Sequence, residues 1–528
     1  MFDDGLPGPA QLRDVTDREL IDAIAGWARA SAAAEARKYA AIAELARRRC
    51  SDPEHPDDVC DDWDGAAAEI SCALTVGHGK ALGQIDTALT LRNRLPKTGA
   101  RFLAGELSAA LVSTIVWRTG LIVDDGALAA VDTKIAEHAA KWGTLSKEKL
   151  EQAVDLWVGK FDPDAVRRTR IRQRGRWLEI GDWEDKTGTV SIHGRVSTTD
   201  GALAKQRFVA MISGVCADDP RTMDQRRADA FGALTAGSTH LACRCGNKEC
   251  PAAADDGRAS SVVVHVIAEQ QSLDAEPDSE CDGPLTIEDT KPATPPVQRR
   301  TAGLIPGMRN GIVPAPLLAQ LIAHGAQVRF VPDAGSIDGC PSYRSSAALE
   351  RFIRNRDLTC RVPGCERSAM SADIDHTQPW PNGSTDPWNL KCYCRIHHLL
   401  KTFRDGWSDA QLPDGSVTLT TPTGHTYTTT PLSTLLFPSW NVTTRPSQNR
   451  PPPGHPAESS PQRTLKMPRR RRRRTDARRY RITAERRRNA RERQLEKIAA
   501  TAESTGPAGT TDTALAVRPP EYDDPPPF

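Results

Sequence analysis

The chain has 528 residues, a length that accommodates two to four domains with buried cores. Its formal net charge is only +2, but residues 463–497 contain 17 Lys and Arg against 4 Asp and Glu, so this segment carries +13 and the remainder −11 (2 − 13). An acidic body with a strongly basic C-terminal segment indicates a nucleic-acid partner. No apolar run reaches the roughly 18 residues that a membrane helix needs, which argues against a membrane-spanning protein.

The cysteine content indicates metal binding rather than disulfides. The N-terminal sequence MFDDGLPGPAQLRD lacks the basic start and apolar core of a secretory signal, so we expect a cytoplasmic location. Thiols stay reduced in that compartment. The odd number of 13 cysteines and their Cys-x-Cys and Cys-x4-Cys spacings also favour metal ligation.

The chain up to about residue 160 is predicted to be all-α. Thr16-Asp17-Arg18-Glu19 has the pattern of a capping box, in which a Thr hydroxyl and a Glu carboxylate each accept from the other residue's backbone amide. Good helix-forming residues continue from there to Arg49. Further helical patterns cover residues 64–95, 106–119, 126–141 and 146–159.

Short strands enter the pattern after residue 160. The expected elements are strands at 176–180, 189–194 and 262–267, a turn at 185–188, and helices at 200–216 and 219–236. We therefore predict a mainly α fold whose first domain, residues 1–272, is a large helical domain with a small sheet. Residues 273–300 are polar, acidic and Pro-rich, which predicts an interdomain linker.

A second domain is predicted over residues 301–437. Its expected elements are helices at 315–324 and 345–356, a strand at 327–331, and a hairpin at 407–430 with turns at Asp414-Gly415 and Thr423-Gly424. Residues 438–528 are rich in Pro, Arg, Thr and Ser and have too little apolar content to pack. We predict a disordered basic tail there, with a basic helix at about 476–500.

Residues 360–401 concentrate more ligand-type side chains than any other stretch. Cys360 and Cys365 are separated by four residues, and Cys394 and His397 by two. These four side chains make a complete tetrahedral set for a structural zinc ion, with Cys392 as an alternative ligand. The other interpretation is that the cysteines are small buried apolar residues.

A second group of residues in the same stretch suits phosphodiester hydrolysis, which needs an activated water and a cation that neutralises the phosphoryl group. His376 is the candidate general base, because an imidazole titrates near neutral pH. Asp375 and His398 are the candidate ligands of a divalent cation, Mg or Mn. Asn389 is expected to hold His376 or the loop beside it. Lys401 is either a phosphate contact or a solvated helix charge.

The order Cys-x4-Cys, Asp-His, Asn, Cys-x2-His-His-x2-Lys in this stretch resembles the HNH nucleases, whose motif folds as a two-stranded ribbon and a helix around a metal. The resemblance implies a ββα-metal module, stabilised here by zinc, that acts as an endonuclease on double-stranded DNA, nicking or cleaving it, with Asn389 in an orienting role. Many HNH proteins have a cysteine where this chain has His397, which leaves the division of roles between His397 and His398 open. The chain is also similar to the actinobacterial 13E12 repeat proteins, in which a domain of unknown function precedes an HNH module. Residues 218–230 carry that second similarity.

Two further groups of residues are candidates for binding. A second zinc site is suggested by His240, Cys243, Cys245 and Cys250, although reduced loop cysteines explain the pattern equally well. A phosphate-binding arm is suggested by Arg469, Arg470, Arg471, Arg472, Arg473 and Arg474. Such an arm binds nucleic acid without sequence preference, and its alternative is a solvated tail.

The sequence thus predicts a metal-dependent DNA endonuclease with a His general base. Two other functions remain open. One is a zinc-stabilised nucleic-acid-binding protein without catalysis, and the other is a scaffold in which the helical domain is the working part. The sequence gives no oligomeric state and no choice between DNA and RNA.

Overall fold

The computed structural model describes residues 6–51, 56–139, 142, 147–167, 177–181, 189–253, 266–274, 303–306, 308, 311–323, 326–444 and 466–504. They form two compact units, each assembled from segments that are distant in the chain. The first unit comprises Met1–Ala36, Asn93–Arg168 and Arg474–Phe528, and the second comprises Arg37–Arg92 and Thr169–Arg473. The boundaries expected at residues 272, 300 and 437 follow the chain order, whereas the units are discontinuous because long-range packing joins their segments.

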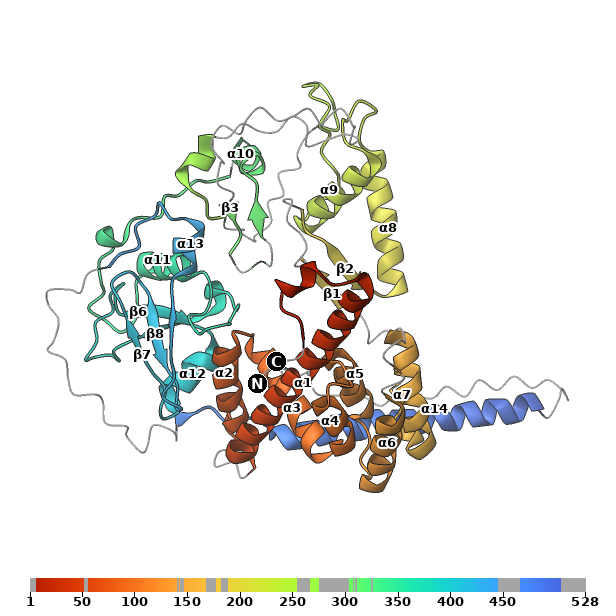
Figure 1. Ribbon diagram of the computed structural model, residues 1–528. Helices are drawn as coiled ribbons and strands as arrows, with labels where there is room; N and C mark the ends of the chain where they lie inside the picture. Colours follow the sequence, from red (N-terminus) through yellow and green to blue (C-terminus); the bar gives the residue numbers. More distant parts are fainter. Residues whose placement is uncertain are drawn as a thin grey trace. The chain divides into compact units, whose positions relative to one another are not determined.

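The described part of the chain is mainly helical and contains small antiparallel sheets (Figure 1). This agrees with the predicted fold class at the level of secondary structure. Among the described residues, none of the helices combines the length and the apolar character that a bilayer crossing requires.

The first unit is helical. Its elements are η1 (Gln11–Arg13), the first part of α1 (Asp17–Cys50), α4 (Pro96–Leu103), α5 (Ala109–Thr119), α6 (Asp125–His138), α7 (Lys147–Phe161), η3 (Pro163–Ala165) and α14 (Arg474–Ser504). The predicted capping box is confirmed, because the Thr16 amide donates to the Glu19 carboxylate at 2.7 Å and the Glu19 amide donates to the Thr16 hydroxyl at 3.3 Å. Helix α4 was not predicted.

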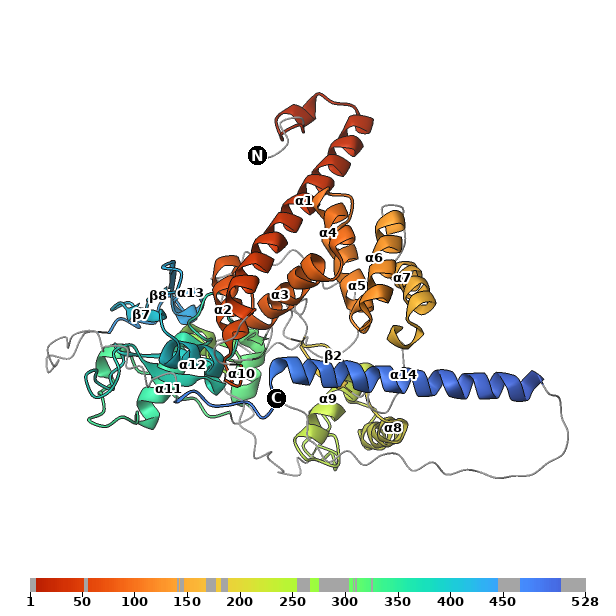
Figure 2. The ribbon, with the colours of Figure 1, turned by 90° about the horizontal axis from the view of Figure 1, so that it is seen from below.

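The basic helix predicted at 476–500 is confirmed as α14, a single long helix (Figure 2). It packs against η3 rather than standing alone. Arg486 donates to the Asp162 carboxylate at 2.6 Å, and the buried Asn489 amide donates to the Asp164 carbonyl at 2.6 Å. Arg493 also forms an ion pair with the Asp164 carboxylate. Part of the predicted tail therefore belongs to a folded unit.

The second unit begins with the rest of α1 and continues with α2 (Asp62–Leu74) and α3 (His78–Asn93). One helix was predicted over 64–95, but the chain breaks it at Thr75, which has a left-handed φ of 52°. Next come β1 (Trp177–Ile180) and β2 (Ile192–Arg195), which pair antiparallel, then α8 (Thr198–Ser213) and α9 (Met223–Thr235). The expected turn at 185–188, residues 262–265 and most of the expected linker lie outside the described residues.

The remainder of the second unit carries the Cys/His stretch. Its elements are η5 (Gln270–Asp274), β3 (Gly303–Leu304), β4 (Ile312–Val313), α10 (Ala315–Ala323), η7 (Ala334–Ser336), α11 (Ala347–Asp357), η8 (Ala369–Ser371), β5 (Asp373–His376), β6 (Leu390–Tyr393), α12 (Arg395–Phe403), β7 (Ser408–Gln411), β8 (Val417–Thr420), β9 (Thr426–Thr429) and α13 (Leu432–Leu436). The strand predicted at 327–331 is wrong, since these residues have no regular secondary structure. The predicted hairpin is a three-stranded sheet, because Gly415 (φ 79°) and Gly424 (φ 81°) form two turns.

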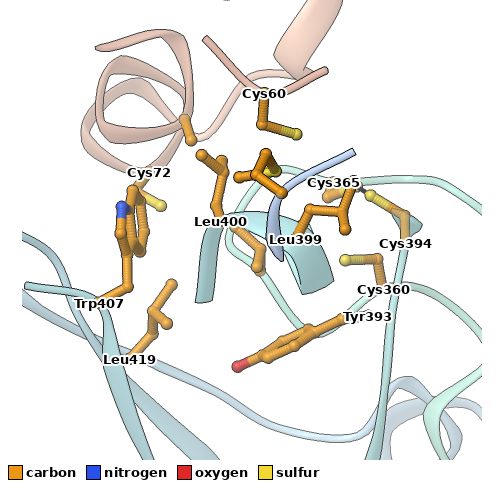
Figure 3. Close-up of a cluster of buried hydrophobic side chains, with 13 residues drawn as sticks. Cys60, Cys72, Cys360, Cys365, Tyr393, Cys394, Leu399, Leu400, Trp407 and Leu419 are labelled. Atoms are coloured by element: carbon orange, nitrogen blue, oxygen red, sulfur yellow. Dashed lines mark hydrogen bonds between the residues drawn. The ribbon is translucent and has the colours of Figure 1, made fainter. Parts of the chain in front are cut away.

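One apolar core joins sequence-distant parts of the second unit (Figure 3). We call it the shared core; its members come from α2 and the loop before it, from the Cys/His stretch, from the three-stranded sheet and from the segment before α14. Its buried members are Cys60, Ala68, Cys72, Cys360, Val362, Cys365, Tyr393, Cys394, Leu399, Leu400, Trp407, Leu419 and Met467. The three cysteines of the candidate zinc site are therefore members of a core to which α2 contributes.

Candidate metal centre and adjoining polar network

The structure brings Cys360, Cys365, Cys394 and His397 together. Their ligand atoms all lie within 4.8 Å of one another, and all four residues are buried. The His397 Nδ1 atom lies 3.4 Å from the Sγ atoms of both Cys360 and Cys394. The first two cysteines flank a turn that Gly364 makes with φ 71°, and the other two residues lie at the start of α12. These four residues can hold a metal ion such as zinc.

The electrostatics of this cluster suit a cation. Contacts with Cys360 and Cys365 lower the pKa of the Cys394 thiol far below its ordinary value. Burial raises the pKa of the Cys360 thiol well above its ordinary value. Thiols that are buried side by side cannot all ionise unless a cation neutralises them, and zinc binding does so by releasing their protons. The alternative ligand Cys392 is not part of this group and packs in a different apolar cluster.

The His397 ring lies against another histidine. His78, the first residue of α3, meets His397 edge-on with ring centroids 5.6 Å apart. The His78 Nε2 atom lies 3.0 Å from a carboxylate oxygen of Asp64, and Arg470 donates to the other oxygen at 2.6 Å. The sequence interpretation did not identify His78, which lies more than 300 positions from its partner.

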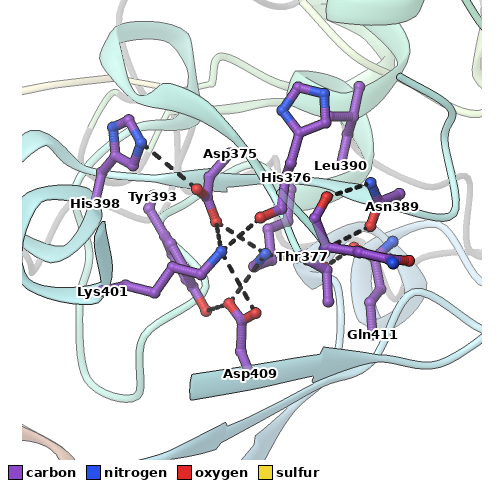
Figure 4. A network of polar contacts seen from close by, with 12 residues as sticks. Asp375, His376, Thr377, Asn389, Leu390, Tyr393, His398, Lys401, Asp409 and Gln411 are labelled. Atoms are coloured by element: carbon purple, nitrogen blue, oxygen red, sulfur yellow. Dashed lines mark hydrogen bonds and ion pairs between the residues drawn. The ribbon is translucent and has the colours of Figure 1, made fainter. Parts of the chain in front are cut away.

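Asp375 and His398 also come together, as predicted for a pair of cation ligands (Figure 4). Strand β5 presents Asp375, and α12 presents His398 with its Nε2 atom 3.5 Å from the Asp375 Oδ1 atom. The His398 Nδ1 atom lies 2.8 Å from the Asp373 carboxylate. A carboxylate that holds one imidazole nitrogen orients the other toward a metal. The sequence interpretation missed Asp373, although residues two apart on a strand lie on the same face.

Two lysines neutralise the Asp375 carboxylate. Its Oδ2 atom accepts from Lys401 at 2.6 Å and from Lys391 at 3.0 Å. Lys391 also pairs with the buried Asp409 at 3.0 Å. Burial would raise the pKa of Asp375, but the two lysines hold it at about 2. Lys401 is buried and donates to the Asp375 carboxylate and to the His376 carbonyl, so the alternative of a solvated helix charge is wrong, whereas its phosphate contact stays a prediction.

The His376 imidazole makes a different set of contacts. Its ring stacks on Tyr343 at a centroid distance of 5.4 Å, and its Nε2 atom lies 3.0 Å from the Thr385 hydroxyl. That hydroxyl donates its hydrogen to the Ser342 carbonyl at 2.7 Å, so it accepts from His376. A neutral His376 therefore carries its proton on Nε2, and Nδ1 keeps the lone pair. Burial lowers the pKa of His376, which favours this neutral form.

Asp375, His376 and His398 do not form a three-ligand cluster, within the part of the chain that the structure describes. Successive strand residues point to opposite faces, so His376 leaves the face of β5 that Asp375 occupies. Of these three side chains, only the Asp375 carboxylate and the His398 imidazole come together.

Asn389 fastens the loop that follows His376. Its buried amide nitrogen donates to the carbonyls of Gln378 and Ser384 at 3.0 and 2.8 Å. Its amide oxygen accepts from the Gln378 backbone at 2.8 Å. Of the two roles expected for Asn389, the structure gives it contacts with the loop.

The second cysteine group differs from the one predicted. The atoms that cluster within 4.8 Å belong to Cys216, Cys243, Cys245 and Cys250. His240 is not a member, so its prediction as fourth ligand is wrong and Cys216 takes that place. Cys216 follows α8, and the packing of α8 against α9 helps to bring it to the other three.

Part of the arginine run is engaged within the second unit. Arg470 donates to the Val59 carbonyl at 2.6 Å and to Asp64, and Arg473 donates to the Asp57 carboxylate at 2.8 Å. Arg469 forms a single bridge with Asp58 in its backbone. These contacts attach the segment before α14 to the loop before α2.

The comparisons with known proteins show the family. Residues 27–357 match the family described as "Domain of unknown function (DUF222)", and this match ends before Cys360. The chain is 50% identical over 488 residues to the uncharacterized protein Rv3776 of Mycobacterium tuberculosis (strain ATCC 25618 / H37Rv), covering 92% of this chain and 93% of that protein. It is also 50% identical over 501 residues to the uncharacterized protein Rv2100 of the same strain, covering 92% and 90%. No solved structure matches the chain. The chain therefore belongs to the DUF222 family.

Proposed function

We propose that this chain is a metal-dependent DNA endonuclease of the HNH type, with β5, β6 and α12 as its ββα-metal motif. The observation that carries the proposal is the pairing of Asp375 with His398 at 3.5 Å on the strand and helix of this motif. The Cys/His cluster lies at the start of the same helix. We assign zinc to that cluster, where it would fix the position of α12.

The donor set fits a divalent cation. Asp375 is ionised because its pKa is held at about 2. When Asp373 accepts from the Nδ1 hydrogen of His398, the Nε2 lone pair faces the Asp375 oxygen, so two acceptor atoms lie side by side. Mg or Mn, when bound there, would supply the positive charge that stabilises a phosphoryl group during cleavage.

His376 is the proposed general base. Its Nε2–H donates to Thr385, so the Nδ1 atom is the one that can take a proton from water. Tyr343 holds the ring from one side by stacking. Asn389 keeps the loop after His376 in place through its three hydrogen bonds.

A nicking assay tests this assignment. Supercoiled plasmid is incubated with the full chain in Mg, Mn, Ni or Zn, alongside the His376→Ala variant. Loss of a general base lowers rates by about 10²–10⁴-fold. We therefore expect nicking by this variant to be at least about 100-fold slower, with a cooperative melting transition and DNA retardation in a gel both retained.

The matched control is His425→Ala, which changes an exposed histidine directly before β9. It should nick at the wild-type rate. Nicking by His376→Ala at that same rate would refute the role of His376.

A second function is favoured by one observation, the double pairing of Asp375 with Lys391 and Lys401. These cations compete with a metal for the carboxylate, as expected of a zinc-stabilised module that binds nucleic acid without cutting it. DNA retardation without nicking in any of the four metals would establish that function. A protein that neither retards DNA nor contains zinc would instead indicate a scaffold. Because thiolate ligands need a reducing compartment, we place either function in the cytoplasm.

A further inference from the structure

The second cysteine cluster lies on the α8–α9 hairpin, apart from the proposed HNH motif. Cys216 follows α8, and the other three cysteines lie on the loop after α9. The Cys216 and Cys243 sulfurs are 3.3 Å apart, and all four sulfurs lie within 4.8 Å of one another. We propose that Cys216, Cys243, Cys245 and Cys250 hold a second structural zinc ion, independent of the nuclease proposal.

The distances match a four-thiolate site. Zinc binds thiolates at about 2.3 Å in a tetrahedron, which places neighbouring sulfurs roughly 3.8 Å apart. The 3.3 Å between Cys216 and Cys243 and the upper limit of 4.8 Å for every pair are compatible with that value, whereas a disulfide would require about 2.05 Å for a bonded pair.

The backbone shapes the loop without help from the sulfur atoms. The Cys243 amide donates to the Ala252 carbonyl at 2.7 Å, and the Cys250 amide donates to the Asn247 carbonyl at 3.1 Å. Gly246 has a φ of 74°, which turns the chain directly after Cys245. The loop therefore brings three thiols to one point.

A buried ion network fixes Cys216 relative to this loop. Asp219 accepts from the Arg221 guanidinium at 2.7 Å and from the Arg244 amide at 2.8 Å. Arg221 also donates to the Ala242 carbonyl at 2.7 Å and to Asp229 of α9 at 2.8 Å. The Asp219 and Arg221 side chains are almost fully buried. The segment after Cys216 is thus tied to both neighbours of Cys243.

The hairpin has a small apolar core, so a bound metal ion would add stability that the core does not supply. Its apolar cluster contains three buried residues: Met211, Ala230 and Leu241. Small cores supply little stability, and metal ligation commonly supplies the remainder. A structural zinc ion contributes its binding free energy directly to folding.

The experiment measures zinc per chain in the full-length protein by elemental mass spectrometry. Cys216→Ser should lower the content by one equivalent relative to the wild type. His240→Ala, the matched control, should leave it unchanged. Equal zinc content in Cys216→Ser and wild type, or loss in His240→Ala alone, would overturn the proposal.

Cobalt substitution of the wild type keeps the proposal testable if the Cys216→Ser variant does not fold. Cobalt(II) in a four-thiolate site absorbs differently from cobalt(II) in the three-thiolate, one-imidazole site formed around His397. The double variant Cys394→Ser/His397→Ala should retain a pure four-thiolate spectrum. A disulfide linking Cys216 to Cys243 in protein purified without oxidant, detected by peptide mass mapping, would count against zinc. Because neither measurement involves DNA cleavage, failure here is distinct from failure of the nuclease proposal.

Discussion

The two carboxylates of β5 each lie near a different ring nitrogen of His398. Asp373 lies 2.8 Å from the His398 Nδ1 atom, and Asp375 lies 3.5 Å from its Nε2 atom. Burial acts to raise the pKa of Asp373, but the contacts with His398 and Arg395 together lower it, so Asp373 is ionised at neutral pH. We infer that Asp373 is a positioning residue that orients His398.

Replacing this carboxylate by an amide should weaken cation binding. Loss of such a partner commonly costs about 10–100-fold in metal affinity. For Asp373→Asn we expect the Mn concentration that gives half-maximal nicking to rise by that factor, while the rate at saturating Mn changes less. The control is Asp405→Asn, an exposed carboxylate after α12, which should leave the Mn dependence unchanged. Identical Mn curves for Asp373→Asn and wild type would refute the positioning role.

Sequence spacing indicated a candidate ligand where another ligand-type residue lies within a few positions of it in the chain. Cys394 and His397 share one helical turn, so their spacing alone indicated a site. Cys216 and Cys243 are 27 positions apart, and nothing local marks them as neighbours. The sequence therefore suggests His240 as the fourth ligand, whereas in the structure the packing of α8 against α9 places the Cys216 sulfur beside the other three.

At the scale of elements, α12 depends on its first turn. Cys394 is its N-cap and His397 follows in the first turn, so two of the four cluster residues fix the start of this helix. Strand β6, which leads into α12, is held from α11, because Asp357 accepts from the Cys392 amide at 2.7 Å and the fully buried Arg356 donates to the Leu390 carbonyl at 2.7 Å.

Two neighbouring cysteines should respond differently to substitution. Cys394→Ser should remove one zinc equivalent and lower the melting temperature strongly, because structural zinc supplies folding free energy. Cys392→Ala, at a buried position outside the cluster, should keep the full zinc content. Its free energy of unfolding should fall by only about 1 kcal/mol through lost packing. Elemental analysis and thermal melts of both variants check this. A loss of zinc in Cys392→Ala would instead indicate that Cys392 is a zinc ligand.

Secondary structure was predictable where one local pattern dominated. The capping box set the start of α1, and the two Gly turns set the strands of the three-stranded sheet. The strand expected at 327–331 had suitable residues, but the described segment pairs with no neighbouring strand. A strand requires a partner, and the sequence does not show where one will be.

At the scale of the whole chain, the positive charge is concentrated on α14 and the segment before it. One side of α14 faces η3, where Arg486 and Arg493 pair with acidic residues. Arg481, Arg487 and Arg491 are exposed. On a helix with 3.6 residues per turn these three arginines lie on the side away from Arg486 and Arg493. Under the proposed nucleic-acid function, these three arginines are candidates for phosphate contacts, whereas the exposed Arg479 pairs with Asp476.

Salt dependence of DNA binding should distinguish the two sides of α14. Each lost phosphate contact lowers the slope of log affinity against log salt by about 0.9. We expect Arg487→Gln/Arg491→Gln to lower the slope by up to about 2 and to leave the melting temperature unchanged. The matched variant Arg486→Gln/Arg493→Gln should lower the melting temperature and leave the slope unchanged. The reverse pattern, or equal slopes in all three proteins, would contradict this division.

The division into units was beyond prediction from the sequence. Residues 37–92 read locally as ordinary amphipathic helices, and residues 466–473 read as part of a solvated tail. Their packing partners in the second unit are hundreds of positions away, for example Arg470 with Asp64. Local composition does not encode such pairings.

The shared core also limits how this protein can be dissected or recombined. An expression fragment that starts at residue 301 would leave the apolar surface around Leu399 and Met467 exposed to water, because Cys60, Ala68 and Cys72 would be missing. The segment that carries the Cys/His cluster therefore cannot be moved by itself into another protein. A fragment that is to fold in another protein must also contain residues 56–92 and 466–473.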